Sequence, residues 1–140
     1  MNWILLAVLT AAFYGMYNFF IKVSSGDINQ IAGAVILQVV AALVGGVILV
    51  FLMITNTTIE ITAKGVKYAV LAGIFVGLAE ITSFYVFSKG ISASTGIPII
   101  IGGSVVVGAF LGLTFLRETL TPIQYVAIAM IVIGVIFLAR

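Results

Sequence analysis

Residues 28–54 read INQIAGAVILQVVAALVGGVILVFLMI and contain no Lys, Arg, Asp or Glu. A helix needs about 20 mostly apolar residues to cross the hydrocarbon core of a bilayer. The chain holds four more runs of this kind, at residues 3–23, 63–89, 92–116 and 122–139. The sequence therefore predicts an all-α integral membrane protein, in which residues 1–140 form a single unit of five transmembrane helices.

The composition of the whole chain agrees with this prediction. Of the 140 residues, 64% are hydrophobic and 7% are charged, whereas about a quarter of the residues in an average soluble domain are charged. The net charge of +2 is too small and too scattered for binding to nucleic acid. Because the chain has no Cys and no His, we expect no metal site, no cofactor and no thiol or His-based catalysis.

Two breaks between the apolar runs carry signals for the start of a helix. Asp27, followed by Gln30 three residues later, fits a capping pair for the second helix. Thr121, Pro122 and Gln124 fit the start of the last helix, with Thr121 as N-cap and Pro122 at a position where its missing N–H is not needed. The apolar N-terminus has no basic segment before it, so we expect a retained helix rather than a signal peptide.

The Lys and Arg residues indicate no preferred orientation in the membrane. With five spans the two termini face opposite sides, and the loops divide the cations equally. Those on the side of the N-terminus are Lys64, Lys67 and Arg117, and those on the other side are Lys22, Lys89 and Arg140. Orientation normally follows an imbalance of such residues. The tie favours insertion in both orientations and an antiparallel homodimer, although six charges also allow a tie by chance.

Glu80 is the only acidic residue well inside a predicted span. A charged side chain at the centre of a bilayer costs roughly 2.5–3.5 kcal/mol even on the lenient insertion scale, and such residues usually face a cavity or a partner. Gly73, Gly77, Phe84 and Phe87 share its helix face by their spacing. We expect Glu80 to bind a proton or a cationic substrate, and the alternative is a protonated side chain that is hydrogen-bonded across helices.

Polar and helix-breaking residues also mark the first and fourth helices. Tyr14, Asn18 and Lys22 form one stripe on the first helix, where Lys22 either anchors the interface or contacts an anion or counter-ion. In the fourth helix Pro98 removes one helical hydrogen bond, which predicts a hinge or, alternatively, a static kink. Small and polar residues at helical spacing predict helix packing: Gln38 in the second helix, Gly73 and Gly77 in the third, and Gly102, Gly103, Ser104, Gly108 and Gly112 in the fourth.

Several stretches of the chain resemble the EamA-type unit of the drug/metabolite transporter superfamily. The opening FYGMYNFFIK at residues 13–22 is similar to the first helix of that family. The strongest similarity lies in Glu118-x-Leu-Thr-Pro within residues 112–124 and in the glycine-bearing last helix at residues 127–138. Residues 88–98 also match, so the resemblance covers nearly the whole chain.

The resemblance implies an assembly and a location for the binding site. Members of the family commonly have ten helices in two five-helix units of inverted topology, so a chain with one unit is expected to form an antiparallel homodimer. The cavity in the family is lined mainly by the first, third and fourth helices of each half. The candidates on those helices are Tyr14, Asn18, Glu80, Tyr85 and Ser94, whereas Glu118 beside Arg117 is expected to be structural.

We therefore expect a transporter of a small metabolite or drug-like solute in the plasma or inner membrane. It would work by alternating access, and proton-coupled export is the favoured direction. One alternative is a flippase of lipid-linked groups, a role that small relatives in this superfamily have. Another is a non-transporting subunit of a hetero-oligomer. An enzyme is not expected, because the chain has no paired carboxylates and no nucleophile–base pair.

Overall fold

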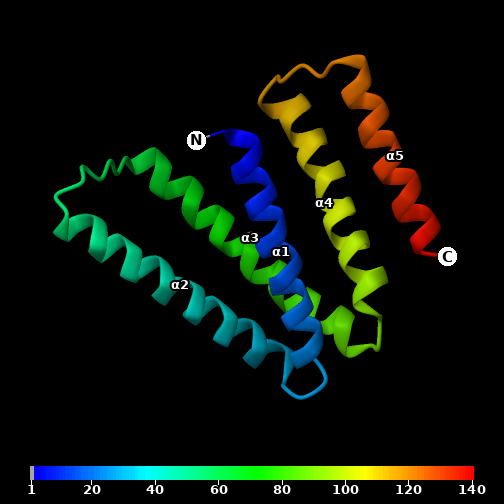
Figure 1. Cartoon of the computed structure of the whole chain (residues 1–140), viewed down its shortest axis with the longest axis horizontal. Helices are drawn as coiled ribbons and strands as arrows, with labels where there is room; N and C mark the ends of the chain where they lie inside the picture. The colour runs from blue at the N-terminus through cyan, green and yellow to red at the C-terminus, as the bar shows by residue number, and fades with distance from the viewer. Residues whose placement is uncertain (1) are drawn as a thin grey trace. The chain divides into compact units, whose positions relative to one another are not determined.

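A computed structural model describes residues 2–140, which form five α-helices and no strand (Figure 1). The helices are α1 (Trp3–Ser24), α2 (Gln30–Ile54), α3 (Ala63–Ser88), α4 (Ala93–Phe115) and α5 (Pro122–Leu138). Their bounds agree with the predicted spans within two residues at each end, and the all-α class is confirmed. Helices α1 to α4 are long and apolar enough to cross a membrane. Helix α5 has 17 residues, at the lower end of the spanning range.

The start of α2 differs from the predicted one. Asn29 is the N-cap, because its side-chain oxygen accepts hydrogen bonds from the backbone N–H groups of Ile31 at 3.0 Å and Ala32 at 3.2 Å. Asp27 lies two residues earlier, in the turn that follows α1, where its own N–H donates to the carbonyl of Ser24 at 3.0 Å. The prediction of Asp27 as the capping residue was therefore wrong.

The predicted start of α5 is confirmed. Thr121 is the N-cap and Pro122 is the first helical residue. The side-chain oxygen of Gln124 accepts a hydrogen bond from the backbone N–H of Thr121 at 2.7 Å, which is the returning half of a capping box. Because Thr121 and Gln124 bond to each other and Pro122 has no N–H to satisfy, this helix start depends on local contacts.

The chain divides into two compact units, which are described separately. Residues 20–90 contain the last turn of α1 together with α2 and α3, and α2 packs against α3. Residues 1–19 and 91–140 contain most of α1 together with α4 and α5, and α4 packs against α5. Each unit is thus built around one helical hairpin.

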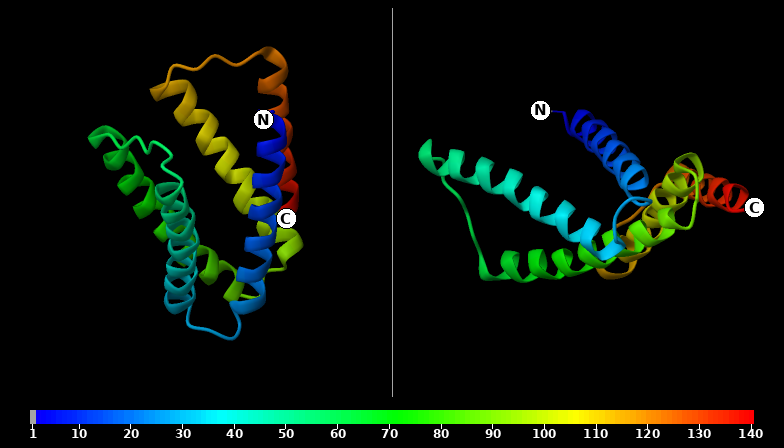
Figure 2. Two further views of the ribbon diagram at one scale, coloured as in Figure 1. Left: turned by 60° about the vertical axis from the view of Figure 1, so that its left-hand side comes forward. Right: turned by 90° about the horizontal axis from the view of Figure 1, so that it is seen from below.

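Helices α2 and α3 converge toward the N-terminus of α2 and the C-terminus of α3 (Figures 1 and 2). Near this end the ring of Phe84 lies against Gly33, where a Cβ atom would be only 2.5 Å from ring atom Cε1. Farther along the two arms, a Cβ atom on Gly46 or Gly73 would meet no heavy atom of the described residues within 4 Å. The closest packing of this hairpin is therefore confined to its converging end.

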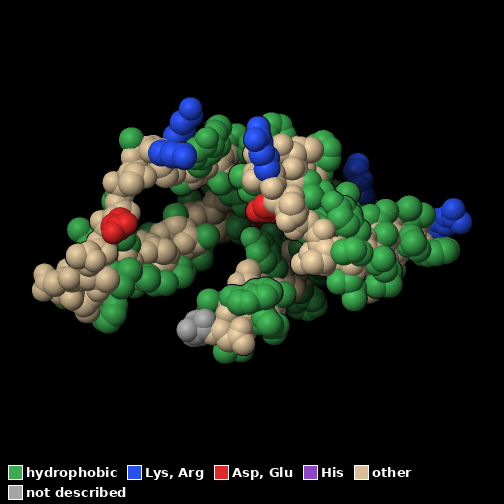
Figure 3. Space-filling model, turned by 90° about the horizontal axis from the view of Figure 1, so that it is seen from above, with side chains coloured by type: hydrophobic (Ala, Val, Ile, Leu, Met, Phe, Trp, Pro, Cys, Tyr) green, Lys and Arg blue, Asp and Glu red, His purple; other side chains and the backbone are tan. Residues whose placement is uncertain are grey.

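Buried hydrophobic residues are few in the described part of the chain. They are Ile21, Ala34, Phe84 and Phe87, all of which belong to the unit of residues 20–90. Most other large apolar side chains are exposed, and hydrophobic side chains are spread over the face seen in Figure 3. Apolar surface of this extent suits a lipid environment and helix partners rather than water. With its long apolar helices, the chain is a multi-pass membrane protein.

Candidate functional site

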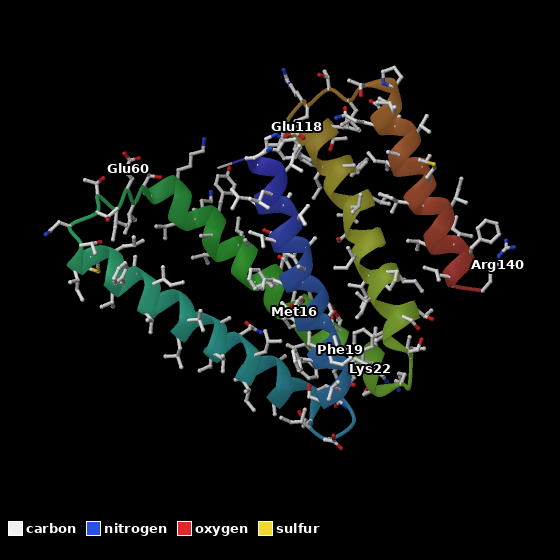
Figure 4. All side chains as sticks on the ribbon, viewed as in Figure 1. Met16, Phe19, Lys22, Glu60, Glu118 and Arg140 are labelled. Atoms are coloured by element: carbon white, nitrogen blue, oxygen red, sulfur yellow. The ribbon has the colours of Figure 1, made fainter. Side chains whose placement is uncertain are left out.

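Glu80 lies on the face of α3 that also carries the buried residues Ser83, Phe84 and Phe87, and its side chain is 2% exposed. The other acidic side chains of the described residues are in loops, as Figure 4 shows for Glu60 and Glu118. Ser83, one helical turn from Glu80, is 6% exposed. An ionised carboxylate accepts hydrogen bonds and a protonated one also donates, so this position can hold either a proton or a cationic group.

Helix α2 presents small residues and one amide to the buried face of α3. Ala34 is fully buried. The amide of Gln38 lies against Gly77, where a Cβ atom would be 3.4 Å from Oε1 and 3.8 Å from Nε2 of Gln38. Gln38 is the only polar residue of α2 beyond its first position, Gln30. The structure thus brings together three of the predicted residues, Gln38, Gly77 and Glu80, in one hairpin.

Lys22 contacts the end of α3. Its side-chain nitrogen donates a hydrogen bond to the main-chain carbonyl of Phe87 at 3.4 Å, and Figure 4 shows Lys22 near the C-terminal end of α1. A cation is favourable at the C-terminus of a helix, where the carbonyl groups carry partial negative charge. The contact therefore stabilises the end of α3, and the predicted roles of Lys22, as an anchor at the membrane interface or as a contact for an anion or counter-ion, stay predictions.

Tyr14 and Asn18 belong to the unit of residues 1–19 and 91–140. Asn18 is 1% exposed, and its Nδ2 donates to the carbonyl of Tyr14 at 2.8 Å. Its Oδ1 atom is buried and has no hydrogen-bond partner among residues 2–140. The ring of Tyr14 is half exposed and lies edge-on to Tyr17, with 5.6 Å between the ring centroids. The side-chain oxygen Oδ1 of Asn18 is therefore a buried acceptor that residues 2–140 leave unused.

Three other predicted site residues, Tyr85, Ser94 and Pro98, are exposed. Tyr85 follows Phe84 on α3 but is 45% exposed, because neighbouring helical positions point in different directions. Ser94 is exposed, and its hydroxyl lies 3.2 Å from that of Ser92 in the first turn of α4. Pro98 is also exposed, and α4 continues through it as one helix.

The predicted small residues of α4 divide into two groups. A Cβ atom on Gly102 would collide with Cγ2 of Val135 in α5, and one on Gly112 would lie 2.5 Å from Oε2 of Glu118. Gly103 and Gly108 meet no heavy atom of the described residues within 4 Å, and Ser104 hydrogen-bonds only within its own helix. Gly102 and Gly112 therefore pack against other side chains of the chain. Gly103 and Gly108 have open space where a Cβ atom would stand.

Two buried polar residues lie outside the predicted set. Ser83 is one turn from Glu80, so the same helical spacing that grouped Gly77 with Glu80 also indicates Ser83. Ser25 is 2% exposed, and its hydroxyl donates to the carbonyl of Lys22 at 2.9 Å. This bond to the main chain has no signature in the sequence.

Comparison with known proteins places this fold in a family. The whole chain, residues 1–140, matches the model of the EamA-like transporter family. Uncharacterized protein MJ1333.1 of Methanocaldococcus jannaschii is 31% identical over 137 residues, which cover 97% of this chain and 95% of that protein. No solved structure matches the chain. The resemblance to the EamA-type unit is thereby confirmed, and the chain belongs to the EamA-like transporter family of membrane proteins.

Proposed function

We propose that the protein exports a small cationic metabolite or drug-like solute across the plasma or inner membrane in exchange for a proton bound at Glu80. One observation carries this proposal. The Glu80 carboxyl is 2% exposed on a helix that is otherwise apolar in its middle. A charge in the membrane interior is costly, and such residues mark ion or substrate pathways.

Exchange follows from competition for one carboxylate. The ionised Glu80 side chain binds either a proton or the cationic group of the solute, and one displaces the other. If a proton arrives from the side where protons are abundant, the solute leaves toward that side. A proton gradient then drives export, provided that the site opens to only one side at a time.

An antiparallel homodimer provides this alternating access. The six Lys and Arg residues lie in loops, in the first two turns of α3 or in the last turn of α1, and they divide three against three between the two sides. Two copies in opposite orientations form the inverted-topology repeat from which many transporters are built. The two units would rock around a binding site near the bilayer midplane.

Transport by purified protein in lipid vesicles tests the role of Glu80. The probe is tetraphenylphosphonium, a permanent cation, and the driving force is an imposed pH gradient. Glu80→Gln keeps the size of the side chain and removes its charge, so we expect pH-driven uptake of the probe to be lost. The control Glu118→Gln alters an exposed carboxyl in a loop and should transport like the wild type. Unchanged transport and pH dependence in Glu80→Gln would contradict the proposal.

The orientation of the chain is tested separately. Because the sequence has no Cys, Asn2→Cys and Ala139→Cys each introduce one unique thiol and leave the six cations unchanged. Each variant is labelled with a membrane-impermeant thiol reagent in intact cells and again after permeabilisation. We expect roughly half of the molecules to be labelled from outside in each variant. Labelling of either terminus on one side only would rule out the antiparallel homodimer.

A further inference from the structure

Asn18 marks the point on α1 at which burial of the helix begins. Every residue of α1 before Tyr17 is exposed. From Asn18 onward one face of the helix is buried, since Asn18 and Ile21 are only 1% and 2% exposed and lie three positions apart. Asn18 is therefore the first buried polar residue met along α1 from the N-terminus of the helix.

The amide of Asn18 is oriented by its own helix. Nδ2 donates to the main-chain carbonyl of Tyr14 at 2.8 Å, and the swapped orientation would place two acceptor oxygens against each other. Oδ1 is buried and has no hydrogen-bond partner among residues 2–140. A buried acceptor without a partner costs free energy, so the group that suits this position is a donor with an N–H or O–H.

Side-chain donors of α1 and α4 are already bound to main-chain carbonyls. The hydroxyls of Thr10 and Ser104 each donate to a carbonyl of their own helix, at 2.9 Å and 2.7 Å. Lys22, one turn along α1 from Asn18, directs its ammonium to the carbonyl of Phe87 at 3.4 Å. We therefore expect the donor for Oδ1 to come from outside the chain.

An aromatic ring lies one turn before Asn18 on the same side of α1. Tyr14 is 52% exposed, and residues four apart on a helix surface have Cβ atoms about 5–6 Å apart. A cation is attracted to the face of an aromatic ring, and a charged N–H makes a strong hydrogen bond to an oxygen. The two neighbouring groups together suit an ammonium that carries an N–H, because a neutral donor gains only the hydrogen bond.

We propose that Oδ1 of Asn18 accepts a hydrogen bond from the ammonium N–H of the solute, so that the protein selects primary, secondary and tertiary amines over quaternary cations. This inference rests on the proposed function, in which the solute is a small cation. A site with a buried acceptor rejects an analogue that lacks the donor, because the acceptor is then left unpaired. Tetraphenylphosphonium has no N–H and therefore tests the charge requirement alone.

Binding of a series of amines tests this inference without any transport. The probes are radiolabelled 2-phenylethylamine and its N-methyl, N,N-dimethyl and N,N,N-trimethyl derivatives, whose cations carry three, two, one and no N–H groups. All four are cations at neutral pH, since alkylammonium groups lose their proton only at much higher pH. Equilibrium dialysis against the purified protein in detergent gives a dissociation constant for each probe.

For the wild type we expect roughly tenfold weaker binding of the trimethyl than of the dimethyl compound, because only the last methyl group removes the last N–H. The first two methyl groups should have little effect. Asn18→Leu keeps the size of the side chain and removes the acceptor, so the tenfold step should disappear. Thr10→Val removes an exposed hydroxyl of the same helix and should keep the step.

The wild-type series needs no variant to fold and can overturn the inference by itself. It does so if the wild type binds none of the four amines or binds the last two equally, as expected if only a water molecule occupies the position at Oδ1. A tenfold step that persists in Asn18→Leu would also overturn it, since the acceptor would then lie elsewhere.

The amine series and the transport test fail independently. If the tenfold step depends on Asn18 but Glu80→Gln still transports normally, proton exchange at Glu80 fails and the role of Asn18 stands. If Glu80→Gln loses transport and the wild type shows no step, the role of Asn18 fails and the proposed function stands.

Discussion

The ammonium of Lys22 and the main-chain carbonyl of Phe87 are 3.4 Å apart, in a hydrogen bond that joins the last turn of α1 to the last turn of α3. The same carbonyl accepts the N–H of Gly90 at 3.1 Å. Gly90 has φ +87°, a left-handed conformation that suits glycine and lets the chain turn back onto the helix end. The last carbonyls of a helix have no helical partners, so these two donors stabilise the C-terminus of α3.

Lys22→Met should therefore weaken this junction while keeping a long apolar side chain in place. We expect a loss of about 0.3–1 kcal/mol in the free energy of unfolding, the usual contribution of a cation at a helix C-terminus. Thermal unfolding of the purified protein in detergent, followed by circular dichroism, measures it. Lys64→Met is the control, because an exposed cation at the start of α3 gains nothing from the helix dipole. Equal losses in both variants would show that the contact with Phe87 is unimportant.

Gly33→Ala should destabilise the converging end of the α2–α3 hairpin. Its new Cβ atom would lie 2.5 Å from the ring of Phe84, which is 3% exposed and has little room to move. Overpacking of this kind costs about 1–3 kcal/mol. Adding Phe84→Leu should restore part of the loss, whereas Gly45→Ala, with no described atom within 4 Å, should cost nothing. If Gly33→Ala unfolds at the wild-type temperature, the close contact is wrong.

Gly102 and Gly103 are adjacent in α4, so the effect of adding a methyl group can be compared at a packed and an open position of the same helix. Gly102→Ala would place its Cβ atom against the β-branched side chain of Val135, which cannot rotate away freely. Gly103→Ala would meet no described atom within 4 Å and would replace a poor helix former with a good one. We expect Gly102→Ala to lower the unfolding temperature and Gly103→Ala to leave it unchanged or raise it. The reverse order would contradict the packing of α4 on α5.

The helices could be predicted from the sequence because their bounds depend on local properties. Long apolar runs and short polar breaks place each helix end within two residues of the structure. The capping residues at Thr121 and Gln124 are also local, and their prediction is confirmed. The choice between Asp27 and Asn29 is harder, since both residue types cap helices. Which of the two caps α2 depends on the turn after α1. In that turn the backbone N–H of Asp27 donates to the carbonyl of Ser24.

The surroundings of the candidate site could be predicted only in part. Glu80 is evident in the sequence because a charge interrupts an apolar run. Gln38, which lies against Gly77 one turn from Glu80, was assigned only to packing, because the register between α2 and α3 depends on the contact of Gly33 with Phe84. The partner of Lys22 is a main-chain carbonyl, and every residue carries one. Pairings between helices therefore required the structure.

The equal division of cations leads to a prediction about charge variants. Lys89→Ala with Arg140→Ala removes two exposed cations from the side opposite the N-terminus, and Lys64→Ala with Lys67→Ala removes two from the N-terminal side. Each double variant carries a clear imbalance, so each should insert in a single orientation, opposite to that of the other. Labelling of the Asn2→Cys thiol in each background measures the orientation.

Under the proposed antiparallel homodimer, neither double variant should transport alone, because all copies of each would face the same way. Expressed together in one membrane, the two should form antiparallel pairs and recover uptake of tetraphenylphosphonium in vesicles. Adding Glu80→Gln to both partners should abolish this recovery, which separates assembly from coupling. Full transport by one double variant with a single orientation would contradict the antiparallel assembly, since a parallel pair does not form an inverted repeat.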